Sequence, residues 1–226
     1  MNEPRPKKPL LVLDLDHTLL DFSSKKLIAA APNASTASVP ELISKMKRPY
    51  MDQFLSNAYQ HYDLCVWSQT SWRWLETKLT ELGMLTHPGY KWCFVLDKSS
   101  MFSITSRTKK GKKMDHYVKP LQIIWSKFPG RWGEHNTVHL DDLARNFAMN
   151  LANGLKVTAY YRKKSSSARD IELQGLAQYL GQLAREVSDF RKVKFSQWRE
   201  VLSGKIKLLQ EDSNNGENDE SNAKAN

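Results

Sequence analysis

The chain has 226 residues, of which 40% are hydrophobic and 26% charged, which predicts one globular domain with a substantial core. Two cysteines, Cys65 and Cys93, exclude a disulfide framework, and no His/Cys cluster suggests a zinc site. No apolar run approaches the ~18 residues of a spanning helix, so no membrane association is expected. The net charge of +10 calls for acidic, phosphorylated or nucleic-acid partners, unless the basic runs are solvated loops.

Short apolar runs alternate with helical patterns along the chain. Residues 1–8 form a basic, proline-rich arm, and Leu10–Leu15 predicts a buried strand. Residues 23–44, rich in Ser, Ala, Asn and Thr, predict a flexible insertion, and the polar residues 210–226 predict a disordered tail. The elements expected between them are a helix over 50–59, a strand over 62–67, a helix over 71–82 with Ser71 as N-cap and Gly83 beyond its end, a strand over 92–96, a helix beginning in 118–125, strands over 137–140 and 157–160, and helices over 170–187 and 195–209.

Strands that alternate with helices imply an α/β fold, with a mostly parallel central sheet flanked by helices. In such folds functional sites lie beyond the carboxyl ends of the strands. Polar clusters directly follow three of the apolar strands, at Asp14–Thr18, Ser68–Thr70 and Asp141–Asp142. We therefore expect these three clusters to meet in one site.

The residue types at these strand ends suit phosphate chemistry. Asp14 and Asp16 are two apart, so on an extended strand both would point to one face. A carboxylate is a workable nucleophile toward phosphorus, because the acyl-phosphate that it forms is itself easily hydrolysed. Its attack on an anionic phosphate requires neutralising charge, for which Asp141–Asp142 could hold magnesium and Lys119 is the natural cation. The Ser68 hydroxyl can hold a phosphoryl oxygen.

The segment VLDLDHTLLD around Asp14 resembles motif I, DxDxT, of the haloacid dehalogenase (HAD) superfamily. The resemblance is to the FCP/SCP-type branch, which dephosphorylates the C-terminal domain (CTD) of RNA polymerase II. It covers roughly residues 8–203 and is particularly close to CTD phosphatases that carry a ubiquitin-like domain and act on the proteasome. Further motifs follow in the order of that branch: KRPYMDQFL (Lys47–Leu55), VWSQT (Val66–Thr70), VKPL (Val118–Leu121) and HLDDLARNF (His139–Phe147).

The resemblance implies a Rossmann-like phosphatase domain over residues 9–209, with small insertions rather than a large cap. It implies a magnesium-dependent protein serine/threonine phosphatase that works through an aspartyl-phosphate. The implied site residues are Asp14 as nucleophile, Asp16 as general acid and then base, Thr18, Ser68 and Lys119 as phosphate-binding residues, and Asp14, the backbone carbonyl of Asp16, Asp142 and, directly or through water, Asp141 as ligands of Mg²⁺. Arg107 is a candidate for a second phosphate-binding arginine, and His17 has no assigned role.

The expected partner is a phosphorylated protein, and no nucleic-acid or membrane partner is expected. Only thirteen residues precede Asp14, so we expect no ubiquitin-like domain, and association with the proteasome stays open. The resemblance implies a nuclear location, with the cytoplasm as the alternative. Nothing in the sequence suggests an obligate dimer, so a monomer is expected.

Plainer interpretations exist for each residue and for the whole chain. Ser68 could cap the following helix, Asp141–Asp142 could begin one, and Lys119 could be a solvated lysine. The chain could be a binding scaffold on the same fold, as in a related mitochondrial import subunit that holds presequences. Intact Asp16 argues against that alternative. A nucleic-acid-binding protein is suggested by charge alone, without aromatic and basic residues interleaved in a recognised module.

Overall fold

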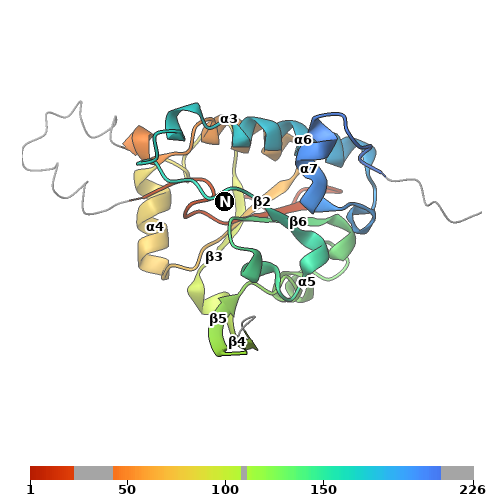
Figure 1. The fold of residues 1–226 in the computed structure, drawn as a ribbon, viewed down its shortest axis with the longest axis horizontal. Helices are drawn as coiled ribbons and strands as arrows, with labels where there is room; N and C mark the ends of the chain where they lie inside the picture. Colours follow the sequence, from red (N-terminus) through yellow and green to blue (C-terminus); the bar gives the residue numbers. More distant parts are fainter. Residues whose placement is uncertain (23–42, 108–110, 210–226) are drawn as a thin grey trace, which may run out of the picture.

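The computed structural model describes residues 1–22, 43–107 and 111–209. Its centre is a five-stranded parallel sheet in the order β3-β2-β1-β6-β7 (Figure 1). The strands are β1 (Leu10–Leu13), β2 (Asp63–Trp67), β3 (Trp92–Leu96), β6 (Thr137–Asp141) and β7 (Gly154–Lys156). The predicted α/β fold with a parallel central sheet is confirmed.

Strand β1 lies in the middle of the sheet and is completely buried. It pairs with β2 on one side and β6 on the other, which explains a continuous apolar run in place of an alternating one. Successive side chains still point to opposite faces, because the strand repeats every two residues. Leu11 and Leu13 therefore enter one hydrophobic core, and Leu10 and Val12 enter another on the opposite face.

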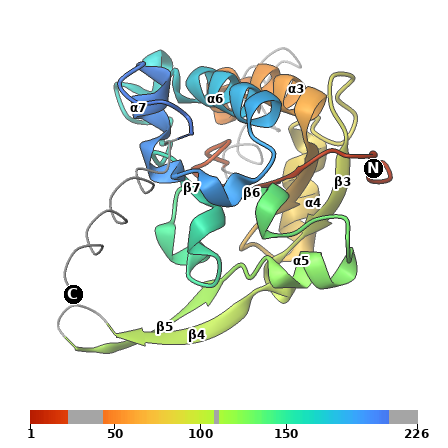
Figure 2. The same ribbon diagram turned by 90° about the vertical axis from the view of Figure 1, so that its right-hand side faces the viewer.

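Helices cover both faces of the sheet. The larger core is closed by α3 (Met51–His61), α4 (Trp72–Glu81), α6 (Glu172–Glu186) and α7 (Trp198–Leu202). The smaller core is closed by α5 (Gln122–Lys127). Figure 2 shows α3 and α6 above the sheet and α5 below it. The helices predicted over 50–59, 71–82 and 170–187 are confirmed, and Gly83 adopts the left-handed φ of +66° expected beyond the end of α4.

An antiparallel hairpin, β4 (Phe102–Arg107) and β5 (Lys113–Val118), projects from the body of the protein (Figure 2). The helix expected to begin in 118–125 therefore starts late, at Gln122. Pro120 explains the delay, because the residue before a proline is disfavoured in helical conformation. The hairpin itself was not predicted from the sequence.

Three further predictions are wrong in detail. Residues 157–160 form no strand. The chain turns away from the sheet here, and the backbone N–H of Tyr160 donates to the carbonyl of His17 instead of to a neighbouring strand. The helix expected over 195–209 is reduced to a short 3₁₀ turn and α7. It ends before Gly204, whose φ of +71° is incompatible with a right-handed helix. Strand β1 is also shorter than predicted and ends at Leu13.

The terminal and inserted segments are described only in part. The arm of residues 1–8 packs on the sheet, where Arg5 pairs with the buried carboxylate of Asp63 at 2.8 Å. Most of the insertion predicted over 23–44 and all of the tail predicted over 210–226 lie outside the described residues. Within the described residues, no helix is long and apolar enough to cross a membrane.

Candidate active site

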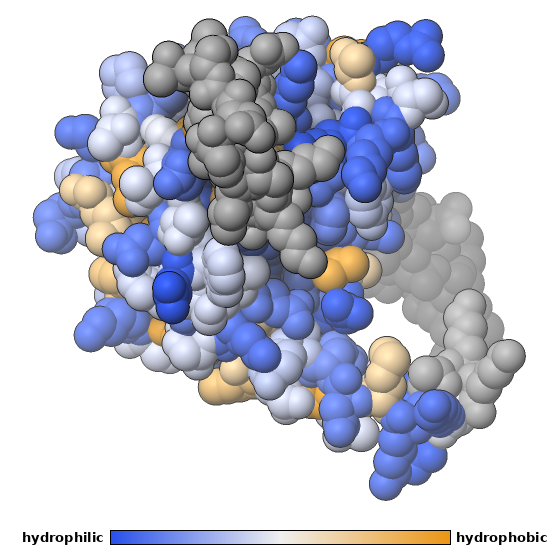
Figure 3. Space-filling view, turned by 90° about the vertical axis from the view of Figure 1, so that its left-hand side faces the viewer, coloured by the Kyte–Doolittle hydropathy of each residue, from blue (hydrophilic) through white to orange (hydrophobic). Residues whose placement is uncertain are grey.

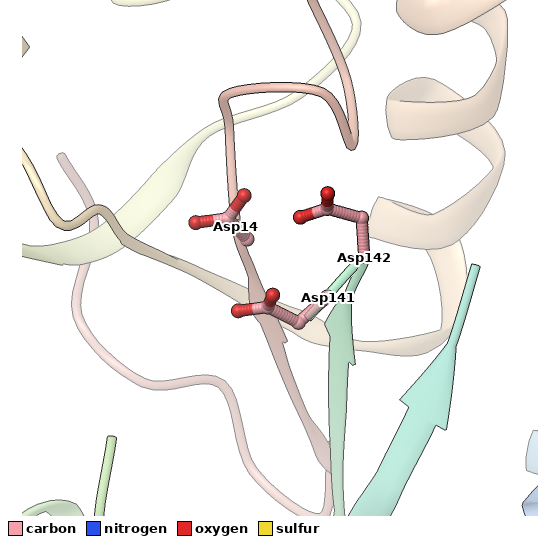
Figure 4. A group of neighbouring side chains, drawn as sticks. All are labelled: Asp14, Asp141 and Asp142. Atoms are coloured by element: carbon pink, nitrogen blue, oxygen red, sulfur yellow. The ribbon is translucent and has the colours of Figure 1, made fainter. Parts of the chain in front are cut away.

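The carboxylates of Asp14, Asp141 and Asp142 meet at the carboxyl edge of the sheet, as expected (Figure 4). Asp14 follows β1, while Asp141 ends the neighbouring parallel strand β6, so the chain brings them out side by side. All three are buried, and one oxygen of each lies within 4.8 Å of the others. Closely grouped carboxylate oxygens are hard ligands that fit a divalent metal ion. This donor set agrees with the predicted metal site.

Lys119 lies between the carboxylates of Asp14 and Asp141. Its Nζ is 2.6 Å from Oδ1 of Asp14 and 2.7 Å from Oδ2 of Asp141, and its side chain is completely buried. The residue comes directly after β5, so the base of the hairpin places it. Burial alone would lower the pKa of Lys119, but the two carboxylates raise it above its usual value. Lys119 is therefore a buried cation, which excludes the alternative of a solvated lysine.

The three carboxylates differ in their surroundings. Burial raises the pKa of Asp14 to about 7 against the opposing charge of Lys119. Burial also raises the pKa of Asp142, and the neighbouring Asp141 raises it further. The pKa of Asp141 is lowered in spite of its burial, because Lys119 and His139 favour its charged form. One lysine thus faces three acids, so the cluster has an excess of negative charge when all three are ionised. The raised pKa values of Asp14 and Asp142 reflect that excess.

Asp141 is also the most fully hydrogen-bonded of the three. Its Oδ1 accepts from the N–H of Leu143 at 2.9 Å, and its Oδ2 accepts from Lys119 and from Asn146 at 2.8 Å. Among the described residues, no side chain donates to the Asp142 carboxylate. Asp142 consequently has more lone pairs available for a metal ion than Asp141.

We expect Asp142→Asn to stabilise the metal-free protein at neutral pH by about 1 kcal/mol, since the variant removes an uncompensated buried charge. The melting temperature in EDTA should rise by about 2–4 °C. The gain should vanish as the pH falls toward the ordinary carboxyl pKa, because the raised pKa destabilises the fold only where the unfolded chain is ionised.

Calorimetry in EDTA and in excess MgCl₂ measures both effects of Asp142→Asn. Mg²⁺ should raise the melting temperature of the parent protein and leave that of the variant unchanged. The control is Glu76→Gln, which removes the same charge from an exposed position on α4. This variant should not change the melting temperature in EDTA and should keep the stabilisation by Mg²⁺. Destabilisation by Asp142→Asn in EDTA would contradict the excess of negative charge.

Thr18 connects the ends of the two central strands. Its buried Oγ1 donates to Oδ2 of Asp14 at 3.2 Å and accepts from the N–H of Asp142 at 3.1 Å. The hydroxyl therefore holds the Asp14 carboxylate in a fixed position relative to β6. This geometry agrees with the predicted role of Thr18 in orienting the nucleophile.

Ser68 follows β2 and is buried at the same edge of the sheet. Its Oγ lies 2.8 Å from the Thr70 hydroxyl and accepts from the N–H of Thr70 at 3.2 Å. The N-cap residue of α4 is Ser71, which makes no side-chain cap. Ser68 thus belongs to a local turn and does not cap α4, which removes its plainer interpretation.

Asp16 is not one of the three grouped carboxylates, although its charge helps to raise the pKa of Asp14. Asp14 and Asp16 both lie beyond the end of β1 at Leu13. The Asp16 side chain is 35% exposed, and its Oδ1 accepts from Nζ of Lys78 at 2.7 Å. Lys78 is itself buried on α4, and its contact with Asp16 was not predicted from the sequence. Its position offered a signal, because it occupies the inward stripe of α4 with Leu75, Leu79 and Leu82.

The structure does not bring Arg107 to this site. Arg107 pairs with Lys113 near the tip of the hairpin, whereas Phe102 pairs with Val118 at its base. The five residue steps from Phe102 to Arg107 span about 16 Å at the usual rise of a strand, so Arg107 is far from Lys119. The buried side chains that do surround the carboxylates, and that were not predicted, are His139 and Asn146.

Comparison with known proteins agrees with this geometry. Residues 9–191 match the model of a family described as NLI interacting factor-like phosphatase, which is most of the chain. The chain belongs to the NLI interacting factor-like phosphatase family. The predicted resemblance to FCP/SCP-type phosphatases is therefore confirmed.

Relatives within the NLI interacting factor-like family are similar over nearly the whole chain. Ubiquitin-like domain-containing CTD phosphatase 1 of Homo sapiens and that of Gallus gallus are each 38% identical over 205 residues, or 91% of this chain. The chain spans 58% of the length of these curated relatives. The solved structure of Fcp1, an essential RNA polymerase II CTD phosphatase, superposes with a TM-score of 0.55 at 14% identity, covering 90% of this chain and 68% of that one. This last likeness supports the fold alone.

Proposed function

We propose that this chain is a magnesium-dependent protein serine/threonine phosphatase that forms a transient aspartyl-phosphate on Asp14. The observation that carries the proposal is the contact of Asp14 with the buried cation Lys119, beside Asp141 and Asp142. An anionic nucleophile can approach an anionic phosphate only where positive charge is already in place. Family membership and the names of the relatives support the same activity.

In the proposed first step, the Asp14 carboxylate attacks phosphorus while Asp16 protonates the departing serine or threonine oxygen. The hydrogen bonds from Thr18 and Lys119 orient the attacking carboxylate. In the second step, Asp16 removes a proton from the water that hydrolyses the phosphoenzyme. The contact with Lys78 holds Asp16 outside the buried cluster, where a leaving group can reach it. Ser68 and Lys119 would bind the phosphoryl oxygens.

The donor chemistry of the site fits Mg²⁺. We assign Asp14, Asp142 and the backbone carbonyl of Asp16 as its ligands, with Asp141 acting beside the site through its hydrogen bonds to Lys119 and Asn146. When bound, the ion would neutralise charge on the phosphate and on Asp14 and Asp142. The same carboxylates repel one another in its absence.

The proposed substrate is a phosphorylated segment of a protein, such as a CTD-like or proteasome-associated phosphopeptide. The relatives are called CTD phosphatases, which supports a phosphoprotein substrate. A nuclear location agrees with this proposal. Proteasome association is not assigned, because the chain spans only 58% of the relatives that carry a ubiquitin-like domain.

Hydrolysis of p-nitrophenyl phosphate and of a phosphoserine peptide, in MgCl₂ and in EDTA, tests the proposal. We expect turnover of both substrates with Mg²⁺ and loss by a factor on the order of 10³ or more in EDTA, restored by added Mg²⁺. The melting temperature in EDTA separates loss of metal from loss of fold. A folded, Mg²⁺-loaded protein without turnover would instead favour the scaffold alternative.

A further inference from the structure

A cavity of about 640 Å³ lies between the segment before α3 and the segment after β7. We call it the basic groove, because lysines and arginines line much of it. Its basic residues are Lys45, Lys47, Arg48, Arg162 and Lys163, and its acidic residue is Asp52. None of these residues takes part in the chemistry proposed above. Figure 3 shows that hydrophilic residues predominate on the left-hand face of the protein as drawn in Figure 1.

The basic groove is lined by more basic than acidic side chains. Within the lining, five basic side chains face one acid. Lys47 pairs with Asp52 at 2.8 Å. Two acids from outside the lining pair with the arginines: Asp170 lies 2.9 Å from Arg48, and Asp21 lies 3.8 Å from Arg162. Lys47, Arg48 and Arg162 are therefore each paired with an acid. Lys163 is exposed and has no ion-pair partner among the described residues.

The first turn of α3 adds to the positive potential of the groove. Tyr50 precedes the helix with a left-handed φ of +65° and makes no side-chain cap. The amino end of α3, which lines the groove through Met51, Asp52 and Gln53, therefore offers the positive pole of the helix dipole. A left-handed tyrosine is an uncommon and costly conformation, and such conformations cluster at binding sites.

Both walls of the groove are attached to the loop that carries Asp14. On one wall, Arg48 donates to the carbonyl of Thr18 at 3.0 Å, and Thr18 in turn donates to Asp14. On the other, the N–H of Tyr160 donates to the carbonyl of His17 at 2.7 Å. His17 also has a left-handed φ, of +63°. The groove is thus joined to the nucleophile through two contacts, and three extended residues of a substrate chain would span about 10 Å.

We propose that the basic groove binds a second phosphate group on the same substrate chain, about three to five residues from the phosphate that is removed. The inference rests on the proposed phosphatase function and names its substrate class as multiply phosphorylated segments. A phosphate carries close to two negative charges at neutral pH and accepts charge-assisted hydrogen bonds from lysine and arginine. Those properties complement the lining of the groove and the free lysine at its rim.

Peptides with one phosphoserine, and with a second phosphoserine placed two to eight residues away on either side, test the groove. We expect kcat/KM to increase about tenfold, mainly through KM, for second phosphates three to five residues away on one side. Within each variant, the readout is the ratio of kcat/KM for doubly and singly phosphorylated peptide. In Lys163→Glu that ratio should fall close to one.

The matched control is Lys127→Glu, which makes the same charge change on the exposed surface of α5 and should keep the ratio of the parent protein. Lys45→Glu provides a second groove variant with the same expectation as Lys163→Glu. Equal stimulation at every spacing, or an unchanged ratio in both groove variants, would overturn the inference. So would stronger competition by a single-stranded RNA oligonucleotide than by the doubly phosphorylated peptide, which would make the groove a nucleic-acid site.

Turnover of p-nitrophenyl phosphate separates failure of the proposed phosphatase function from failure of the groove assignment. If the parent protein hydrolyses neither this compound nor the singly phosphorylated peptide, the proposed phosphatase function fails. If it hydrolyses both but shows no preference for a second phosphate, only the assignment of the groove fails.

Discussion

Asp14→Asn is expected to abolish turnover of every phosphate ester, by a factor on the order of 10⁴ or more, because an amide cannot form the acyl-phosphate. The fold should persist, since asparagine has nearly the same shape and the variant removes a buried charge whose pKa is raised. Rapid quenching with a ³²P-labelled substrate measures the phosphoenzyme directly. Labelled protein should accumulate in the parent and be absent from Asp14→Asn.

Asp16→Asn is the comparison that separates nucleophile from acid. General acid catalysis contributes typically 10²–10⁴-fold, and it matters most when the leaving group is a poor one. Asp16→Asn should therefore lose far more activity toward a phosphoserine peptide than toward p-nitrophenyl phosphate in the first step, with phosphoenzyme still formed from the latter. Equal losses by both variants with both substrates would contradict the proposed division of roles.

Lys119→Met is expected to cost both activity and stability. The change leaves Asp14, Asp141 and Asp142 buried together without their cation, and removing one partner of a buried ion pair typically costs 3–5 kcal/mol. The melting temperature in EDTA should fall by on the order of 10 °C. Activity in Mg²⁺ should fall by on the order of 10³-fold, since charge stabilisation of the phosphate is lost.

Two controls give the Lys119 prediction its specificity. Lys78→Met removes another buried lysine, but its partner Asp16 is 35% exposed, so the loss of stability should be smaller. The double variant Lys119→Met with Asp141→Asn removes a cation together with one of its acids and should regain part of the lost stability. A double variant that is as unstable as the sum of the two single variants would show that packing, and not charge, sets the role of Lys119.

The sequence alone was sufficient to predict that Asp14 and Asp141 meet at the carboxyl edge of the sheet. Asp14 and Asp141 follow apolar strands that pair in parallel, and the carboxyl ends of parallel neighbours must lie together. Lys119 was found by motif order, although only the structure shows that it is buried between two acids. The positions of these residues could be predicted because they rest on local patterns and a strongly constrained topology, while their roles stay predictions.

What the sequence did not reveal depends on contacts between distant segments. Arg48 is completely buried and pairs with Asp170, 122 residues away, and no local pattern distinguishes it from a surface arginine. The contact between Asp16 and Lys78 is similar, although the inward stripe of α4 could have exposed it. The left-handed conformations of His17 and Tyr50 could not be predicted either, since tyrosine rarely adopts this conformation and the modest enrichment of histidine in it does not single out one position.

The carboxylates of the proposed site lie at the ends of sheet strands, whereas the surfaces around them are built from connecting segments. Asp14 and Asp141 come from the two central strands, whose side chains are packed on both faces of the sheet. The basic groove and the β4–β5 hairpin come from connecting segments outside that sheet. Loops tolerate sequence change far better than buried strands do. Changes in the connections could therefore redirect the proposed phosphatase to new phosphoproteins, while the carboxylates at the ends of β1 and β6 stay in place.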